Sequence, residues 1–328
     1  MGFYGIIFCM ENYWILSYYA YTELNDPFKE VTEHKDFFKD RDVKSRVYIS
    51  EQGINGQLSA SVEDAKAYME WLKEKKPFHN IQFKIHPYKE HTFPRTTVKY
   101  RKQLVGYDMT ADLSKGGEHV SPQKWREMLE SDEEILHLDV RNDFEWDIGH
   151  FKGAERAPCK TSRDFAKFAD SLASREKAKE KPVMMSCTGG IRCEIFSAVL
   201  KEKGFKNVFQ LDGGMVNYGL QEGGKHWLGK LFVFDDRMAV PLNESENTVI
   251  GKCAHCSSPS DDYYNCANMD CNFLFLSCRA CIEELKGCCS AKCQSAPRLR
   301  PVSEQNPNKP FRKKYNYNTP GEESPDIV

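Results

Sequence analysis

The sequence predicts a mixed α/β protein made of an α+β ferredoxin-like domain, a parallel α/β domain and a cysteine-rich segment. Three observations support this fold class. Residues 13–88 read as elements in the order β-α-β-β-α-β, and residues 121–226 alternate short apolar strands with helices. Nine cysteines fall within the 41 residues that end at Cys293. A chain of 328 residues is long enough to build these parts with ample core.

The predicted organisation has six parts. We expect an N-terminal extension, a ferredoxin-like (acylphosphatase-like) domain, a polar linker, the α/β domain, the cysteine-rich segment and a disordered tail, over residues 1–12, 13–108, 109–120, 121–226, 227–296 and 297–328. The tail is rich in Pro, Lys, Asn and Glu and has few apolar residues, which is typical of disorder.

Composition excludes several classes of protein. The net charge of −2 gives no global basic field, so a nucleic-acid partner must use a local patch. No run of 18 uncharged apolar residues occurs, so we expect no membrane span. Residues 3–9 are apolar but lack the basic start of an export signal. Thirteen cysteines without such a signal favour free thiols and metal over disulfides, and a cytoplasmic location.

Periodicity defines the elements of the first domain. Helices are predicted over residues 27–40 and after the N-cap Ser61, where Asp64 stands at capping-box spacing. Strands are predicted over residues 13–20, 46–50, 56–60 and 81–86. The glycine-containing stretch at residues 52–56 is interpreted as a hairpin turn. Because many proteins use this fold as a binding module, the fold alone assigns no function.

A basic segment follows at residues 95–102. Lys99 and Arg101 share one face of the predicted strand, and Lys102 comes next. These three side chains are candidate contacts for RNA phosphates. An edge strand protected by charge explains the same pattern equally well, so both interpretations stay open.

The second domain alternates strands and helices. Ser121 and Pro122 open a helix that ends near residue 130, and a further helix is predicted over residues 163–172. Strands are predicted over residues 135–140, 183–186 and 208–211, and a turn at residues 212–214 leads into a short helix. This order predicts a parallel sheet with its functional site at the carboxyl ends of the strands.

The loop after the strand at residues 183–186 carries the strongest chemical signal. Cys187 ends the strand, two glycines follow, and a helix predicted over residues 194–203 stops at Gly204. Amides at a helix N-terminus favour negative charge, and the glycines let them form a concave nest, so the thiol pKa should lie well below ~8.5. We predict Cys187 as a nucleophile. Its anion-stabilising loop consists of Thr188, Gly189, Gly190, Ile191 and Arg192.

Two alternatives compete with this interpretation. A cysteine at a strand end is often an inert core residue, but packing does not explain the glycine pair together with Arg192. Cysteine phosphatases cradle phosphate with a Cys-x5-Arg loop, whereas Cys187 and Arg192 form the shorter Cys-x4-Arg. The shorter ring suits a terminal sulfur or another small group on Cys187, which disfavours a phosphatase.

The cysteine-rich segment has metal-ligand spacing. Two Cys-x2-Cys pairs are each followed by further cysteines, a pattern typical of structural zinc sites that stabilise a segment with too small a core. The candidate ligands are Cys253, Cys256, Cys266, Cys271, Cys278, Cys281, Cys288, Cys289 and Cys293. We expect one site from the first four and another from Cys278, Cys281, Cys293 and either Cys288 or Cys289. His255 could replace one ligand, and a disulfide or redox cluster is the alternative.

Three blocks of the second domain resemble the signatures of rhodanese domains, in the right order. The first runs from Asp139 and Arg141 through Glu145 to residue 154, the second is the Cys187 loop, and the third is residues 211–214. In sulfurtransferases of that family the loop cysteine carries a persulfide. Asp139, Arg141 and Glu145 are supporting residues, and ion pairs that fix the surroundings of the loop are the interpretation we favour for them.

The order of the whole chain resembles the rhodanese-containing tRNA uridine hydroxylase family (TrhO). The similarity covers about residues 13–295 and includes the Gly53-Ile54-Asn55-Gly56 stretch, the basic segment, one rhodanese domain and the terminal cysteine cluster. It implies an oxygen-dependent conversion of the wobble uridine of tRNA to 5-hydroxyuridine, an essential Cys187, and an N-terminal domain that helps to hold the tRNA anticodon loop. The sequence contains no flavin, nucleotide or iron motif, and it assigns no oligomeric state.

Two rival functions remain. A sulfurtransferase that moves sulfane sulfur through a Cys187 persulfide fits the loop equally well but needs neither flanking part of the chain. A non-catalytic, zinc-bearing RNA-binding protein has no need of an intact Cys187 and Arg192.

Overall fold

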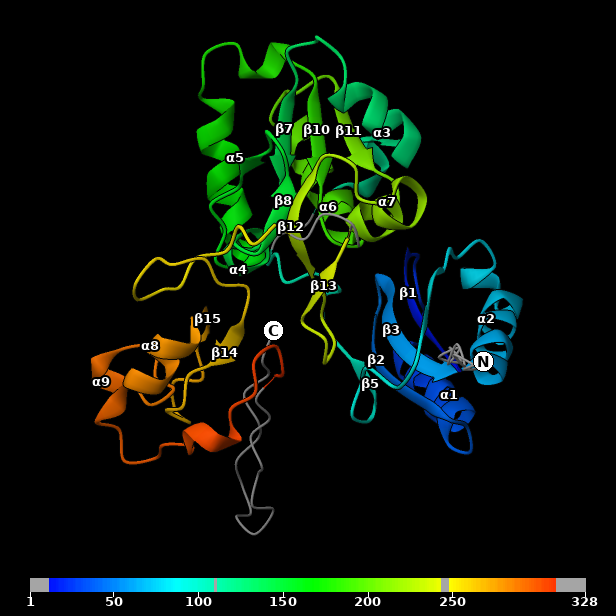
Figure 1. Cartoon of the computed structure of the whole chain (residues 1–328). Coiled ribbons are helices and arrows are strands. Elements are labelled where there is room, and N and C mark those ends of the chain that lie inside the picture. The colour runs from blue at the N-terminus through cyan, green and yellow to red at the C-terminus, as the bar shows by residue number, and fades with distance from the viewer. Residues whose placement is uncertain (1–11, 109–110, 243–247, 311–328) are drawn as a thin grey trace, which may run out of the picture. The chain divides into compact units, whose positions relative to one another are not determined.

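The computed structural model describes residues 12–108, 111–242 and 248–310 (Figure 1). Contacts divide the chain into two compact units, with the boundary between Asp108 and Met109. Within the described residues, no helix is long and apolar enough to cross a bilayer. The predicted extension, and the tail beyond residue 310, lie outside the described residues.

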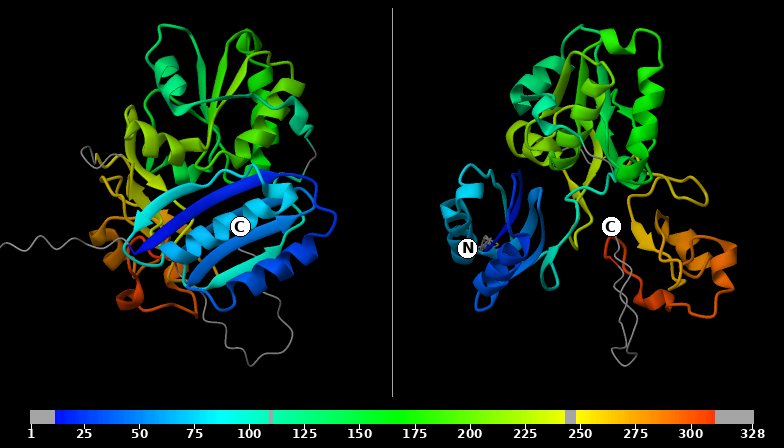
Figure 2. Two further views of the ribbon diagram at one scale, coloured as in Figure 1. Left: turned by 90° about the vertical axis from the view of Figure 1, so that its right-hand side faces the viewer. Right: turned by 180° about the vertical axis from the view of Figure 1, so that it is seen from behind.

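The first unit is a five-stranded sheet with both of its α-helices on one face (Figure 2). Its elements are β1 (Tyr13–Tyr21), α1 (Pro27–Phe38), β2 (Val43–Ser50), β3 (Gly53–Ser61), α2 (Val62–Glu74), the 3-10 turn η1 (Lys76–Phe78), β4 (Lys84–Tyr88) and β5 (Thr96–Tyr100). The strand order β4-β1-β3-β2 is that of the predicted ferredoxin-like fold, and β5 adds a parallel edge strand next to β2. Alternate residues of the strands, such as Leu16, Val47 and Leu58, are fully buried against the helices.

Local sequence explains both helix starts. Asp26 accepts a hydrogen bond from the Lys29 amide, and Pro27 occupies the first turn of α1. Ser61 caps α2 by accepting from the Asp64 amide, as predicted. The Asp64 carboxylate accepts from the Ser61 hydroxyl and from the Asp42 amide.

A hairpin turn joins β2 and β3 as predicted, but it does not extend over residues 52–56. Ser50 pairs with Gly53, so the turn is residues 51–52, and Gly53 already belongs to β3. A Cβ on Gly53, whose φ is +127°, would lie 2.0 Å from the Ala20 carbonyl oxygen, and one on Gly56 would lie 2.1 Å from the Tyr18 ring. These glycines are required by close packing inside the sheet.

The second unit contains a parallel sheet of order β6-β11-β10-β7-β9. Its strands are β6 (Glu118–Val120), β7 (Leu136–Asp139), β9 (Glu155–Arg156), β10 (Val183–Ser186) and β11 (Val208–Leu211). Figure 1 shows α5 on one side of this sheet and α3 and α7 on the other. The α-helices are α3 (Pro122–Leu129), α4 (Asp143–Trp146), α5 (Phe165–Ala173), α6 (Ile191–Glu202) and α7 (Gly214–Glu222), and the 3-10 turns are η2 (Leu113–Lys115), η3 (Ser162–Asp164) and η4 (Ala178–Glu180).

Residues 118–120 were predicted as the end of a linker but form β6. Val120 is buried, and β6 pairs with β11 in parallel at the edge of the sheet. Three residues are too short for a strand to be recognised from periodicity, so only the pairing reveals it.

A smaller sheet, β13-β12-β8, continues this unit into the cysteine-rich segment. Its strands are β8 (Gly149–Phe151), β12 (Trp227–Phe232) and β13 (Ala239–Pro241). The segment itself contains β14 (Tyr263–Asn265), β15 (Leu274–Leu276), α8 (Arg279–Glu284), α9 (Ala291–Gln294) and the 3-10 turn η5 (Val302–Glu304). Tyr263 and Leu276 share a buried cluster with Ile148 and Phe232, and the Tyr263 hydroxyl donates to the Phe144 carbonyl, so the segment packs on the α/β domain.

The disorder predicted from residue 297 is wrong as far as residue 310. The buried Arg300 donates from its guanidinium to the Asn265 carbonyl at 2.8 Å, and its amide donates to the Ala267 carbonyl. The Asn308 amide likewise donates to the Tyr263 carbonyl. Hydrogen bonds order these residues together with Leu299, which packs against the apolar cluster of the segment, so their largely polar composition gives little sign of the order.

Candidate active site and metal centres

Cys187 lies in the loop between the carboxyl end of β10 and the N-terminus of α6. Gly190, with φ of +100°, turns the chain into the helix and donates its amide to Cys187 Sγ at 3.2 Å. Gly189 does not share this conformation, and a Cβ there would meet open space. The sequence analysis predicted that both glycines form the concave nest, but only Gly190 has the backbone conformation that shapes it.

A second glycine closes the loop from the side of α7. Gly214 has φ of +68°, and a Cβ there would lie 2.6 Å from both the Cys187 carbonyl oxygen and the Gly190 nitrogen. The next amide, that of Met215, donates to the Cys187 carbonyl at 3.0 Å. The start of α7 thus packs directly against the loop and holds its backbone in place.

The surroundings of Cys187 favour a thiolate. The residue is fully buried, which raises its thiol pKa. Three effects outweigh burial: a hydrogen bond from the Cys193 thiol, the positive charge of Arg192 and hydrogen bonds from backbone amides. Together they lower the pKa of Cys187 to about 5, so the sulfur is ionised at neutral pH.

Cys193 is a buried neighbour of Cys187 that the sequence analysis did not single out. It lies in the first turn of α6, 1% exposed, and burial followed by its hydrogen bond to Cys187 raises its own thiol pKa. Cys193 therefore keeps its proton while Cys187 is ionised, and its Sγ also lies 3.8 Å from the Met185 carbonyl, a second acceptor. Its position could have been recognised from the sequence. Cys193 follows Cys187 by six residues and falls in the first turn of the helix, where side chains point back toward the loop.

Arg192 is held by a buried carboxylate. Its Nη1 and Nη2 donate to the two oxygens of Glu145 at 2.5 and 2.7 Å, and Thr188 Oγ1 donates to Glu145 at 2.8 Å. Glu145 is fully buried in the α4 turn. Burial raises the Glu145 pKa, but the charge of Arg192 outweighs it and the net shift is downward. Arg192 thus contributes a positive charge and fixes the loop, and both of its terminal nitrogens already donate to Glu145.

Asp139 and Arg141 form a second buried ion pair at the carboxyl end of β7. Arg141 donates from Nε and Nη2 to the Asp139 carboxylate, and from Nη2 to the Gly149 carbonyl at 2.6 Å. Both residues are 1% exposed. The pair ties β7 to β8, which is the structural role that the sequence favoured.

The predicted basic residues lie at the edge of the first unit. Lys99 is exposed in β5, the outermost strand beside β2, and Lys102 is exposed just beyond that strand. Arg101 is half-buried, and its guanidinium lies 5.0 Å from the centre of the Tyr48 ring.

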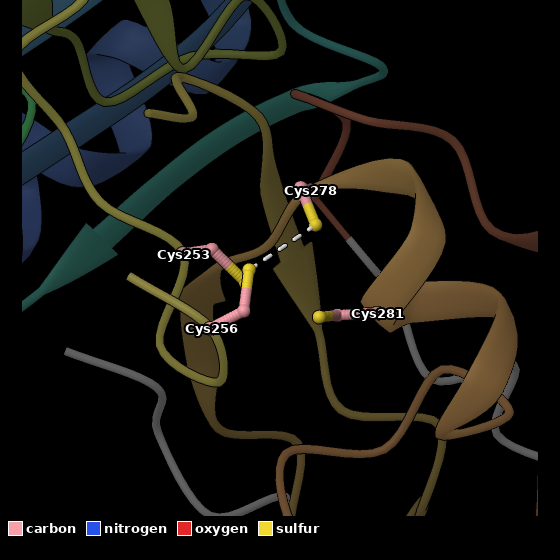
Figure 3. A group of neighbouring side chains, drawn as sticks. All are labelled: Cys253, Cys256, Cys278 and Cys281. Atoms are coloured by element: carbon pink, nitrogen blue, oxygen red, sulfur yellow. Dashed lines mark hydrogen bonds between the residues drawn. The ribbon is translucent and has the colours of Figure 1, made fainter. Parts of the chain in front are cut away.

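Eight of the nine clustered cysteines form two four-thiol groups. Cys253, Cys256, Cys278 and Cys281 make the first group (Figure 3), and Cys266, Cys271, Cys289 and Cys293 make the second. Within each group, all Sγ atoms lie within 4.8 Å of one another. The distance from Cys256 Sγ to Cys278 Sγ is 3.7 Å. A zinc ion with Zn–S bonds of ~2.3 Å in tetrahedral geometry needs sulfurs about 3.8 Å apart, so both groups fit zinc.

The predicted sorting of these ligands is wrong. The two Cys-x2-Cys pairs share one group instead of each starting its own. The reason is the β14–β15 hairpin: the Ala254 amide donates to the Leu276 carbonyl at the end of β15, which brings the first pair beside Cys278. Spacing along the chain defines each pair, but only the fold decides which pairs meet.

Cys288 and His255 belong to neither group. Cys288 is fully buried in the apolar cluster of the segment, with Sγ 3.8 Å from the Lys286 carbonyl. None of the twelve cysteines in the described part of the chain forms a disulfide.

Comparison with known proteins agrees with this architecture. Residues 13–104 match the UPF0176 acylphosphatase like domain, residues 121–221 the rhodanese-like domain, and residues 228–294 the rhodanase C-terminal family. The solution NMR structure of a rhodanese-like domain from Anabaena sp. is 21% identical and covers 34% of this chain and 78% of its own, with a TM-score of 0.29.

Two curated relatives match nearly end to end. The tRNA uridine(34) hydroxylase of Protochlamydia amoebophila (strain UWE25) is 53% identical over 306 residues, which cover 93% of this chain and 96% of the relative. The tRNA uridine(34) hydroxylase of Chlamydia muridarum (strain MoPn / Nigg) is 53% identical over 307 residues, which cover 93% of each chain. With the UPF0176 domain, the Cys187 loop and the paired cysteine groups in place, this chain belongs to the tRNA uridine(34) hydroxylase family.

Proposed function

We propose that this protein is an enzyme that hydroxylates the wobble uridine of tRNA to 5-hydroxyuridine, with dioxygen as co-substrate and Cys187 as the catalytic nucleophile. The observation that carries the proposal is a buried thiolate at a helix N-terminus in a chain 53% identical to tRNA uridine(34) hydroxylases. The substrate segment is the anticodon loop, and the reaction belongs in the cytoplasm, where tRNA is found.

The proposed chemistry starts at the sixth carbon of the uracil ring. Cys187 Sγ adds there, and the electron pair of the C5–C6 double bond moves toward C5 and the C4 carbonyl. The electron-rich C5 takes one atom of dioxygen; the other atom leaves as water after accepting two electrons and two protons from an external reductant. Loss of the C5 proton and departure of Cys187 Sγ then restore the double bond and leave a hydroxyl on C5.

The loop keeps Cys187 Sγ ionised, and this ionisation assists both the formation and the cleavage of the bond between Sγ and C6. A thiolate adds to carbon far faster than a thiol, and a sulfur whose anion is stabilised is also a good leaving group. The Gly190 amide and the Cys193 thiol are hydrogen-bond donors already in place for this anion. Glu145 and Thr188 are positioning residues because they hold Arg192, and they act on the sulfur only through it.

Reaching the sulfur requires movement. Cys187 has no exposed surface, so a base contacts Sγ only after the groups packed over the loop shift. Phe234, which follows β12, lies 6.0 Å from the Arg192 guanidinium and is a candidate for such a group. An unpaired anticodon base is cheaper to turn out of its stack than a base in a duplex, which suits a pocket of this depth.

The two cysteine groups are assigned a structural role. Each would hold one zinc ion through four thiolates, which leaves no open position for a substrate and stabilises a segment with a small apolar core. The N-terminal domain over residues 13–108 is assigned to tRNA binding, and the domain over residues 121–226 to the chemistry.

The test is a nucleoside profile of tRNA by mass spectrometry in a strain that lacks this gene. Complementation with the wild-type chain should restore 5-hydroxyuridine, and the Cys187→Ser chain should not. Cys159→Ser is the matched control, because Cys159 is a buried thiol of the same domain whose pKa is raised by burial to about 12. Full modification by Cys187→Ser would refute the nucleophile, and loss of a thiolated base instead would indicate a sulfurtransferase.

A further inference from the structure

The N-terminal domain has a cleft between its first helix and its edge strand. The cleft, of about 630 Å³, is lined by the last turn of α1 and its cap and by the backbone and side chains of β5. Its lining residues are Lys35, Phe38, Lys39, Arg95, Thr96, Thr97, Val98 and Lys99. Half of them are cationic and none is acidic, so the cleft has a strongly positive wall.

The four cations are available to a ligand. Lys35, Lys39, Arg95 and Lys99 are all exposed, and none forms an ion pair with another residue in the described part of the chain. By contrast, Lys75 at the end of α2 is half-buried against Glu30 and Glu33. Cations at a helix C-terminus complement the helix dipole, and cations on an edge strand deter aggregation. Neither effect explains why cations from both elements line one cleft.

The other end of the same helix and strand presents aromatic surface. Phe28, at the start of α1, is 61% exposed and stacks on Tyr100, at the end of β5, with ring centres 4.6 Å apart and planes inclined by 24°. The Tyr100 hydroxyl donates to Glu51 at 3.1 Å, which fixes the ring. The start of α1 contacts the end of β5 through Phe28 and Tyr100, while the end of α1 lines one cleft with the start of β5, so the helix and strand run in opposite directions.

We propose that this α1–β5 edge binds an RNA strand, with the cationic cleft on its phosphates and the Phe28–Tyr100 pair against an unpaired base. The inference rests on the proposed function and names the tRNA-binding surface of the first domain. Phosphates attract unpaired exposed cations, and single-stranded RNA combines them with bases that stack on aromatic rings. A surface with only one of the two features would fit other anions or other apolar groups.

Binding of unmodified tRNA to the full-length chain tests this directly, by fluorescence anisotropy at several salt concentrations. The cleft variant is Lys35→Gln with Arg95→Gln, and the matched control is Lys76→Gln with Lys89→Gln, two exposed lysines of the same domain outside the cleft. Loss of two phosphate contacts should lower the slope of log Kd against log salt by about 1.4. The control should keep the wild-type slope and affinity.

A Phe28→Ser variant separates stacking from charge. It should weaken tRNA binding by about 5- to 150-fold, the range expected for the loss of one stacked base, with an unchanged salt slope because no charge is removed. Cys187→Ser should bind tRNA like the wild type while failing to hydroxylate it, so failure of this proposal is distinguishable from failure of the proposed function.

Three results would overturn the proposal. The first is a cleft variant that binds tRNA with wild-type Kd and slope, and the second is an equal loss in the control variant. The third is a cleft variant that loses binding to inorganic phosphate or to phosphatidylglycerol vesicles but not to tRNA.

Discussion

The buried ion pair between Glu145 and Arg192 gives a prediction that can be worked from the structure. Glu145 has no exposed surface, and its two oxygens accept from Arg192 at 2.5 and 2.7 Å. Glu145→Gln keeps the shape but replaces one oxygen with an amide donor that faces the guanidinium. It also removes the carboxylate that accepts from both terminal nitrogens of Arg192. Breaking such a pair costs about 3–5 kcal/mol of unfolding free energy.

Thermal unfolding is the assay, followed through the tryptophan fluorescence of the α/β domain, with zinc kept in the buffer. For a unit of this size, that loss corresponds to a fall in Tm of about 6–20 °C. The control is Glu130→Gln, which removes a carboxylate bound to Lys225 and His226 at the surface, where solvent screens the charges. Its Tm should stay close to wild type.

A double variant, Glu145→Gln with Arg192→Leu, completes the test. It also removes the Arg192 guanidinium, so it should unfold at a higher temperature than Glu145→Gln alone. A Glu145→Gln chain with wild-type Tm, or a double variant whose loss equals the sum of the losses of Glu145→Gln and of Arg192→Leu measured separately, would refute the reasoning.

Three further predictions concern the thiols. Cys193→Ala should raise the Cys187 pKa, because it removes a hydrogen bond to the thiolate. Alkylation of Cys187, measured by mass spectrometry of its peptide, should therefore shift to higher pH. An unchanged pH profile would contradict the assignment of Cys193 as the donor. Hydroxylation should persist from pH 8 down to pH 6 and fall as the pH approaches about 5, where Cys187 gains its proton, and activity lost already near pH 8 would contradict this sign. Because folding lowers the Cys187 pKa from 9.0 to about 5, the stability that the thiolate contributes is complete above pH 9.0 and is lost gradually as the pH falls to about 5. The purified chain should contain two zinc ions. The Cys289→Ser chain should retain one zinc ion, and the Cys288→Ser chain should retain both. Equal zinc losses in the two variants would contradict the assignment of Cys289, but not Cys288, to a four-thiol group.

Much of the fold could be predicted because its signals are local. The strands and helices of the first domain follow from apolar periodicity, and the caps at Ser61 and Ser121 from residue type. The active loop is also local, because a strand end, a glycine and a helix start are contiguous in the chain. Even in this loop, the sequence does not show that Gly189 and Gly190 differ. Only the backbone angles show that Gly190 alone has a positive φ.

The errors share a cause as well. Residues 118–120 and 298–310 are ordered by hydrogen bonds to distant segments, which leave no periodic pattern in their own sequence. In the sequence, Gly53 and Gly56 resemble turn residues. The structure shows that the Ala20 carbonyl and the Tyr18 ring occupy the space that a side chain would need at these positions.

The sequence by itself predicted the order of the three parts, the loop that holds Cys187 and the cysteines that gather into four-thiol groups, because each depends on neighbours within a few positions. The tertiary structure alone decided that Glu145 clamps Arg192, that Cys193 donates to Cys187 and that the two Cys-x2-Cys pairs share one site. The physical reason is that hydrogen bonds, ion pairs and tetrahedral ligand sets depend on distances through space, and chain spacing fixes those distances only over a turn or two.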